Sequence, residues 1–206
     1  MSDYLEIERK FDVDPGFGLP DLGSVPGIAD AARPERYHLV ATYFDTPDQR
    51  LAAHKITLRR RTGGSDEGWH LKLPASQAGR DARQEVRAPL ADGSADGTRI
   101  PASLAARVAG ITAGAPVVPI AVLVTERTVH TLTGTSGEVA AEVADDVVTG
   151  ERTAAADGGD PLSWREIEVE LGPAGTPALL DATAKLLRAA GARPSRSPSK
   201  LARVLG

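Results

Sequence analysis

Charged and apolar residues alternate along several segments of the chain, which is the pattern of β-strands with one polar face. In the first of them, Glu6, Glu8 and Lys10 alternate with mostly apolar neighbours. Residues 164–171 repeat the pattern with three carboxylates in phase. Both segments are therefore predicted to be strands whose charges share one face.

The same period of two recurs further along the chain, so most of the protein is predicted to be β-structure. These further segments are residues 56–61, 69–73, 83–88, 120–132 and 138–149. Residues 43–46 also read as the end of a strand followed by a turn. Seven or eight strands separated mostly by Gly and Pro turns predict one antiparallel sheet or barrel.

Helical signals are fewer and flank the strands. Residues 176–191 begin with Thr176 as an N-cap and Pro177 at the first helical position, and they end at Gly191. This punctuation is typical of a well-defined helix. Three shorter helical segments are predicted: residues 101–108 ended by Gly110, residues 49–54 capped by Asp48, and a last turn or two opened by Ser197 and Pro198.

Each charged strand face carries mostly one sign of charge, whereas a solvent-exposed face usually mixes both signs with neutral polar residues. Carboxylates align in residues 164–171, whereas Arg59 and Arg61 align in another strand. Like charges two residues apart repel unless an opposite charge lies between them. If the strands close into a barrel with these faces inward, the bases suit a polyanion and the carboxylates suit Mg²⁺ or Mn²⁺. Together they predict a metal-bound phosphate chain as the ligand.

Composition narrows the class of protein. The 206 residues include no cysteine, which excludes disulfides and zinc–thiolate sites, and the four histidines lack HExxH spacing. The net charge of −4 argues against a nucleic-acid partner. No apolar run approaches the roughly 18 residues of a membrane helix, so a cytoplasmic protein without a membrane partner is expected. No linker or repeat divides residues 1–206, which are expected to form a single domain.

Seven motifs, in order, resemble those of the CYTH superfamily, the triphosphate tunnel metalloenzymes. Residues 6–10 match its N-terminal ExExK signature. The other matches lie at residues 43–46, 56–61, 70–74, 83–87, 164–170 and 197–201. The ExExK motif alone is weak evidence, but the ordered set spans nearly the whole chain. The acidic segments and the C-terminal residues most resemble CYTH domains that precede a CHAD domain in larger bacterial proteins.

The resemblance implies an α+β fold, an eight-stranded antiparallel β-barrel tunnel with flanking helices, and Mg²⁺ or Mn²⁺ as cofactor. The implied metal-binding residues are Glu6, Glu8, Glu142, Asp146, Glu166 and Glu168. The implied phosphate-binding residues are Lys10, Arg59, Arg61, Lys72, Arg87, Arg127 and Lys200. The candidate catalytic residues are Lys10, Glu168 and Lys200. Glu168 would hold a metal that activates water, and a lysine whose pKa is lowered by nearby cations would assist as acid or base.

Several neighbouring residues are assigned other roles. Asp146 is preferred over Asp145 as a metal-binding residue, because Asp146 and Glu142 are an even number of residues apart and so share one strand face. Glu170 is in phase with the acids but is expected at the mouth of the tunnel, and His70 is expected to be structural. Out-of-phase side chains are expected outside the barrel or beneath helices: Arg9, Arg60, Trp69 and Trp164.

Two interpretations of the 83–87 segment stay open. Arg83 and Glu85 form an internal ion pair that positions Arg87, or Arg87 binds the phosphate directly without that help.

The favoured function is hydrolysis of inorganic triphosphate to pyrophosphate and phosphate. Thiamine triphosphatase and class IV adenylate cyclase activities, which the family also contains, are alternatives. A non-catalytic polyphosphate-binding module is the alternative from another class. The expected partner is thus a small-molecule triphosphate or polyphosphate, and both a homodimer and a following CHAD domain stay open.

Overall fold

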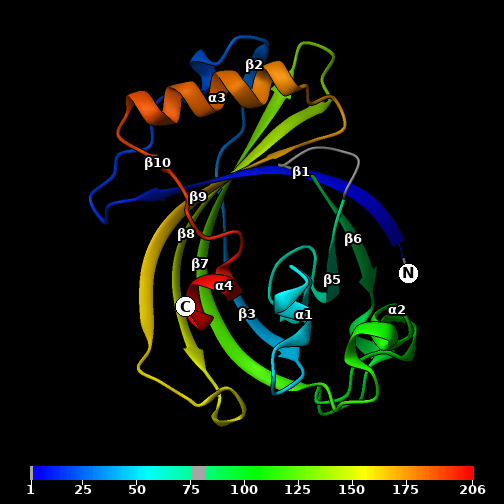
Figure 1. The fold of residues 1–206 in the computed structure, drawn as a ribbon. Helices are drawn as coiled ribbons and strands as arrows, with labels where there is room; N and C mark the ends of the chain where they lie inside the picture. Colours follow the sequence, from blue (N-terminus) through cyan, green and yellow to red (C-terminus); the bar gives the residue numbers. More distant parts are fainter. Residues whose placement is uncertain (1, 76–81) are drawn as a thin grey trace.

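The computed structural model describes residues 2–75 and 82–206, and its centre is a closed barrel of eight antiparallel strands (Figure 1). The strands are β1 Ser2–Val13, β3 Glu35–Asp45, β4 Thr57–Thr62, β5 Gly68–Pro74, β6 Ala82–Ala88, β7 Val118–Gly134, β8 Val139–Arg152 and β9 Leu162–Leu171. Their order around the barrel is β1, β6, β5, β4, β3, β7, β8 and β9. The predicted α+β barrel is confirmed.

β1 closes the barrel because its two halves pair with different neighbours. The first half pairs with β6, and the second half pairs with β9. In the second half, Glu8 lies opposite Glu170 and Lys10 lies opposite Glu168. Alternate side chains of β1 and β9 therefore face the same interior. Two short strands add to the sheet: β2 Ile28–Ala31 pairs with β7, and β10 Arg193–Pro194 pairs with β1.

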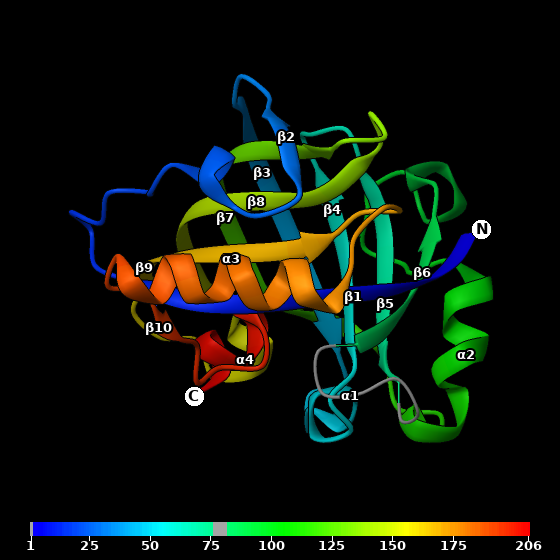
Figure 2. The same ribbon diagram turned by 90° about the horizontal axis from the view of Figure 1, so that it is seen from above.

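Apolar clusters beneath the helices hold the outer faces of the strands. α3, Pro177–Ala189, lies along β1 and β9 (Figure 2) and buries Leu180 and Leu187 against Ile167 and Val169. α2, Ala102–Thr112, packs with a second cluster that contains Trp69. Full burial of one such aliphatic side chain stabilises the fold by about 1.5–3 kcal/mol. The apolar half of the alternation thus anchors the helices and leaves the charged half to the interior.

The third apolar cluster packs α4 against the barrel strands. α4, Lys200–Leu205, places Leu201 against Tyr43, Leu123 and Val148. The N-cap of this helix is Ser199, whose side chain accepts a hydrogen bond from the Ala202 amide. α4 therefore lies fixed against the strands (Figure 1), and its first residue, the predicted site residue Lys200, contacts Asp146 and Glu168 inside the barrel.

The short helix α1, Arg50–Ala53, has a different cap from the one predicted. Asp48 pairs with the Arg50 side chain instead of capping the helix, so that prediction is wrong. The caps are Asp45, which accepts from the Leu51 and Ala52 amides at 2.8 and 2.9 Å, and Thr46, which accepts from the Arg50 amide. A buried aspartate at the end of β3 satisfies these amides better than an exposed one in the turn can.

Other local predictions need correction. α2 continues through Gly110 to Thr112, because a glycine inside a helix costs only about 1 kcal/mol and the apolar face of α2 extends beyond it. The alternation in the first segment also predicts that Leu5 faces outward beneath a helix, but Leu5 is 52% exposed. Trp164 was expected away from the charges, but its indole N–H donates to Glu166 at 2.5 Å, because positions 164 and 166 share one face.

Most of β3 was not predicted, because its inward side chains are apolar and carry no alternating charge. Leu39, Ala41 and Tyr43 are buried on this strand. The turns and remaining short segments include three 3₁₀ helices, η1 Leu22–Ser24, η2 Leu90–Asp92 and η3 Ala154–Ala156. Within the described residues, no helix has the length and apolar character needed to cross a membrane.

Candidate active site

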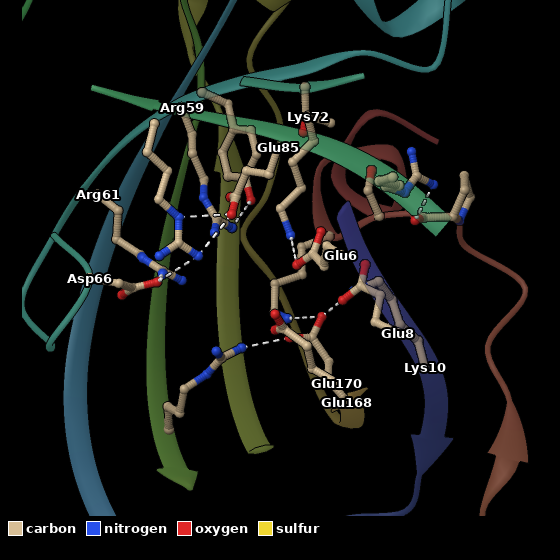
Figure 3. A pocket seen from close by; sticks show the side chains of 18 residues that line it. Glu6, Glu8, Lys10, Arg59, Arg61, Asp66, Lys72, Glu85, Glu168 and Glu170 are labelled. Carbon is tan, nitrogen blue, oxygen red and sulfur yellow. Dashed lines mark hydrogen bonds and ion pairs between the residues drawn. The ribbon is translucent and has the colours of Figure 1, made fainter. Parts of the chain in front are cut away.

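The barrel interior contains a narrow cavity of about 50 Å³ lined mainly by charged side chains (Figure 3). The lining bases are Lys10, Arg59, Arg61, Lys72, Arg83, Arg87, Arg127 and Lys200. The lining acids are Glu6, Glu8, Asp66, Glu85, Glu168 and Glu170. All seven bases assigned to phosphate binding therefore border one cavity.

One side of the interior, called here the acidic wall, consists of five carboxylates and four paired cations. Its carboxylates are Glu6, Glu8, Asp146, Glu166 and Glu168, and its cations are Lys10, Lys72, Arg127 and Lys200. Lys200 Nζ lies 2.9 Å from Asp146 and 2.7 Å from both Glu166 and Glu168. Arg127 donates two hydrogen bonds to Asp146, of 2.8 and 2.6 Å. The acids outnumber their cations by one.

These contacts set the protonation of the acidic wall. Burial raises the pKa of Glu8, but Lys10 and Lys72 outweigh burial and lower this pKa to about 2. Burial lowers the pKa of Lys10 and of Lys200, but the facing carboxylates outweigh burial and raise both pKa values above the usual lysine range. The prediction of a lowered lysine pKa is therefore wrong, because carboxylates are the nearest charged neighbours of both ammonium groups.

The facing side, called here the basic wall, consists of Arg59, Arg61 and Arg87 with the acids Asp66 and Glu85. Figure 3 labels Arg59 and Arg61 next to Asp66. Arg61 contacts Asp66 directly, and Arg87 Nη2 lies 3.9 Å from it. Arg59 Nη1 donates to the Tyr43 hydroxyl at 3.3 Å. Burial, followed by the neighbouring Arg59, lowers the pKa of Arg61.

Buried polar atoms without hydrogen-bond partners mark both walls. Among the described residues, Arg59 Nε and Arg61 Nε are buried donors with no acceptor, and Glu6 Oε2 is a buried acceptor with no donor. Buried polar atoms are normally hydrogen-bonded, so such atoms in a cavity indicate positions for ligand atoms. The basic wall therefore offers donors to an anion, and the acidic wall offers an oxygen to a cation.

A cluster within the acidic wall has the chemistry of a divalent-metal site. Oxygen atoms of Asp146, Glu166 and Glu168 all lie within 4.8 Å of one another. Carboxylate oxygens are the ligands that Mg²⁺ and Mn²⁺ prefer in proteins. The donor set fits these metals, and a metal bound there would compete with Lys200 for the same three carboxylates.

The acids of β8 lie in three different environments, although the alternation predicts that Glu142 and Asp146 belong to one site. Asp146 is fully buried in the cluster, whereas Asp145 pairs with Arg165 at 2.7 Å on the other face of β8. Glu142 is exposed and does not join Asp146; it borders a wider pocket of about 640 Å³ at the mouth of the barrel. Glu170 borders both pockets, and burial together with Glu6 raises its pKa to about 7.

The 83–87 segment is arranged differently from the predicted ion pair. Arg83 donates to the carbonyl oxygens of Lys55 and Pro198, at 3.3 and 3.2 Å, and not to Glu85. Glu85 instead accepts a hydrogen bond of 2.8 Å from Arg87 Nε. Glu85 therefore contacts Arg87 without the help of Arg83.

Sequence reasoning missed three residues that hold the basic wall. Asp66 comes from the loop between β4 and β5, where no strand period applies. Tyr43 belongs to a strand without charge alternation. Tyr4 shares parity with Glu6, and that signal was available: its ring lies 4.6 Å from the Arg87 guanidinium carbon.

A family model described as "CYTH domain" matches residues 5–205. The chain belongs to the CYTH domain family. Members of this family are generally triphosphate tunnel metalloenzymes that use divalent metals. Two uncharacterized proteins of Mycobacterium tuberculosis, from strains CDC 1551 and H37Rv, are each 45% identical to this CYTH domain over 214 residues. The alignments cover 98% of the chain and 40% of each relative, so the chain spans less than half the length of these relatives.

Solved structures share the fold of this CYTH domain. A candidate adenylate cyclase of Bacillus halodurans gives a TM-score of 0.58 at 17% identity and covers 100% of both chains. A Hippeastrum protein described as a candidate adenylyl cyclase with a dominant triphosphatase activity gives a TM-score of 0.51 at 17% identity. That comparison covers 96% of this chain and 93% of the other. At such identities the likeness establishes the CYTH fold alone.

Proposed function

We propose that this CYTH domain hydrolyses inorganic triphosphate to pyrophosphate and phosphate with Mg²⁺ or Mn²⁺. The observation that supports this most directly is the pairing of two walls: buried arginine donors without acceptors face a cluster of buried carboxylates. A triphosphate carries about four negative charges, and phosphoryl-transfer sites neutralise such charge with bases and metal together. A cavity with only one of the walls would not suit this ligand.

The basic wall would bind the phosphate chain. Arg59 Nε and Arg61 Nε would gain their missing acceptors from phosphate oxygens. Planar guanidinium groups bind phosphate with two parallel hydrogen bonds, each stronger than a neutral one. The phosphate chain would therefore lie along β4 and β6, and its reacting end would point toward the acidic wall.

The acidic wall would hold the metal and would face the phosphoryl group that reacts. Asp146, Glu166 and Glu168 would hold the metal. Glu6 and Glu8, which line the same cavity, would add carboxylate oxygens from β1. When bound, the metal supplies charge neutralisation at phosphoryl oxygens and lowers the pKa of water. Lys10 and Lys200 would remain ammonium groups and donate to phosphate oxygens, because their pKa values are raised. Glu168 contacts Lys10, Arg127 and Lys200, so it would also orient three cations around the substrate.

The direct test measures phosphate release from triphosphate with Mg²⁺ or Mn²⁺, with and without a chelator. We expect release that the chelator abolishes. Glu168→Gln should lower kcat about a hundredfold or more, with a smaller change in KM, because it removes charge where the reacting end lies. The matched control is Asp145→Asn, an equal loss of charge on the outer face of β8, which should retain activity. An unchanged rate in Glu168→Gln would rule out this role.

A triphosphate with an organic group is the second candidate, because the mouth pocket has room for one. Tyr4 and Tyr37 border this pocket of about 640 Å³. The same assay with ATP and thiamine triphosphate, together with measurement of cyclic AMP, separates these substrates. Cyclic AMP without phosphate release would favour a cyclase, and tight triphosphate binding without turnover would favour a binding module.

A further inference from the structure

His70 and Glu85 form a buried pair behind the basic wall, with each side chain about 1% exposed. His70 Nδ1 lies 2.8 Å from Glu85 Oε1. The other ring nitrogen, Nε2, lies 2.9 Å from the backbone carbonyl oxygen of Asp66. Both imidazole nitrogens therefore make hydrogen bonds, and the partners restrict where the protons are.

The geometry fixes the number of protons in this pair at two. A carbonyl oxygen only accepts, so His70 Nε2 must carry a hydrogen. His70 Nδ1 then either accepts a hydrogen bond from a protonated Glu85, or it donates as part of an imidazolium to an ionised Glu85. In both arrangements the pair holds two protons and has no net charge.

The surrounding charges place the shared proton on Glu85. Burial, followed by Arg59, Arg61 and Lys72, lowers the pKa of His70 far below its usual value. Burial, followed by Glu170, raises the pKa of Glu85 to about 8. An imidazolium beside these cations is the less stable arrangement, so neutral His70 accepts from a neutral Glu85.

Glu85 also contacts Arg87 through its other oxygen. Glu85 Oε2 accepts from Arg87 Nε at 2.8 Å and from the Tyr4 hydroxyl. The Tyr4 ring supports the same guanidinium from its face. The charged or titratable groups around Glu85 are Tyr4 from β1, His70 and Lys72 from β5, Arg87 on its own strand, Asp66 from the β4–β5 loop and Glu170 from β9.

We propose that Glu85 is a positioning residue that acts as a neutral carboxylic acid, orienting Arg87 by a hydrogen bond without cancelling its charge. His70 Nδ1 accepts a hydrogen bond from the protonated Glu85 and so favours its neutral form. Arg61 and Arg87 then share one other carboxylate, Asp66. Each cation of the acidic wall instead contacts at least one carboxylate directly. The inference rests on the proposed function in one respect, that Arg87 binds a phosphate.

Two variants test the inference, because glutamine reproduces a protonated glutamate. In Glu85→Gln, the amide oxygen can accept from Arg87 and the amide N–H₂ can donate to His70. Glu85→Ala loses both contacts and should weaken binding of inorganic triphosphate about tenfold at pH 7, measured by calorimetry with a chelator in place of metal so that no turnover occurs. Glu85→Gln should restore the affinity to within about twofold of the wild type. Glutamine binding as weak as alanine would overturn the proposal, since an ionised carboxylate would then be required.

The pH dependence gives a second readout. The wild-type affinity should fall as pH rises through about 8, because ionised Glu85 then neutralises Arg87. The affinity of Glu85→Gln should stay level over that range. The same sign applies to folding: a raised pKa stabilises the protein at low pH, and this stabilisation is lost as pH rises to about 8. The unfolding temperature of the wild type relative to Glu85→Gln should therefore decrease with pH.

Nitrogen NMR of the ¹⁵N-histidine-labelled wild type tests protonation without any substrate. We expect His70 to carry a proton on Nε2 alone at pH 7, and protons on both ring nitrogens would overturn the proposal. If triphosphate does not bind at any pH, the proposed function fails, while the His70 spectrum and the stability difference still decide whether Glu85 is neutral. The two failures are thus distinguishable, and the wild-type spectrum answers the question even if a variant does not fold.

Discussion

At the scale of the residue, two adjacent acids on β8 have opposite environments. Replacing each of them measures how much the buried ion pairs of the interior contribute to stability. Asp146 is fully buried between Arg127 and Lys200, whereas Asp145 pairs with Arg165 near the surface. Asp146→Ala should lower the free energy of unfolding by about 3 kcal/mol or more, because it leaves buried cations short of a carboxylate. Asp145→Ala should cost less, because the Asp145–Arg165 pair is partly exposed to water, whereas Asp146 is fully buried. Urea unfolding measures both, and equal costs would contradict the assignment of Asp146 to the interior.

The same residue contributes to the acid sensitivity of the protein. Burial raises the pKa of Asp146, but Lys200 and Arg127 outweigh burial and lower it below the usual aspartate value. A lowered pKa gives stability that is present above the unfolded-state pKa of about 3.9 and is lost as pH falls below it. Unfolding temperatures from pH 7 to pH 3 should therefore decrease more steeply for the wild type than for Asp146→Asn. Parallel curves for the two proteins would argue against this.

Residue parity explains which site residues were predictable. Lys10, Lys72 and Glu168 belong to strands with alternating charge, so their inward direction follows from the sequence. Asp66 belongs to a loop, and its contact with Arg61 depends on how β4 and β5 are joined. Glu142 has the right parity but lies too far along β8, because parity gives the face of a strand and not the depth within the barrel.

At the scale of the element, the position of Lys200 depends on how closely α4 approaches β8. A Cβ at Gly150 would lie 2.6 Å from Val204 Cγ2 and 3.1 Å from Leu123 Cγ. Gly150→Val should therefore push α4 outward, cost about 1–3 kcal/mol and weaken triphosphate binding through Lys200. Calorimetric binding and urea unfolding measure the two effects. Gly110→Ala is the control, because a Cβ there meets nothing within 4 Å; it should stabilise α2 slightly and leave binding unchanged.

The elements themselves were predicted unevenly, for physical reasons. Strands with one charged face, such as β1 and β9, were predictable because one of their faces is charged and the other is apolar. β3 was largely missed because it is apolar toward the interior. The N-cap of α3 at Thr176 was found because capping is local: its side chain accepts from the Leu179 amide at 3.2 Å. The cap of α1 was not, because Asp45 acts from the preceding strand.

At the scale of the whole molecule, the two walls should make stability depend on the proposed ligand. A ligand that binds only the folded state adds about 2.7 kcal/mol at a concentration of 100 Kd. Triphosphate with Mg²⁺ should therefore raise the unfolding temperature of the wild type, and much less that of Arg59→Ala or Arg61→Ala. Sulfate at the same ionic strength is the control for general salt effects. An equal rise in both variants would mean that the basic wall is not the binding surface.

The closure of the barrel through β1 has a consequence for biosynthesis. The first half of β1 gains its partner when β6 is made, but the second half must wait until β9 has left the ribosome. Pairings between strands so distant in the chain form slowly and late in folding. The ExExK carboxylates therefore stay outside a finished site until β9 has been made. A nascent chain should bind neither metal nor phosphate with the affinity of the completed domain.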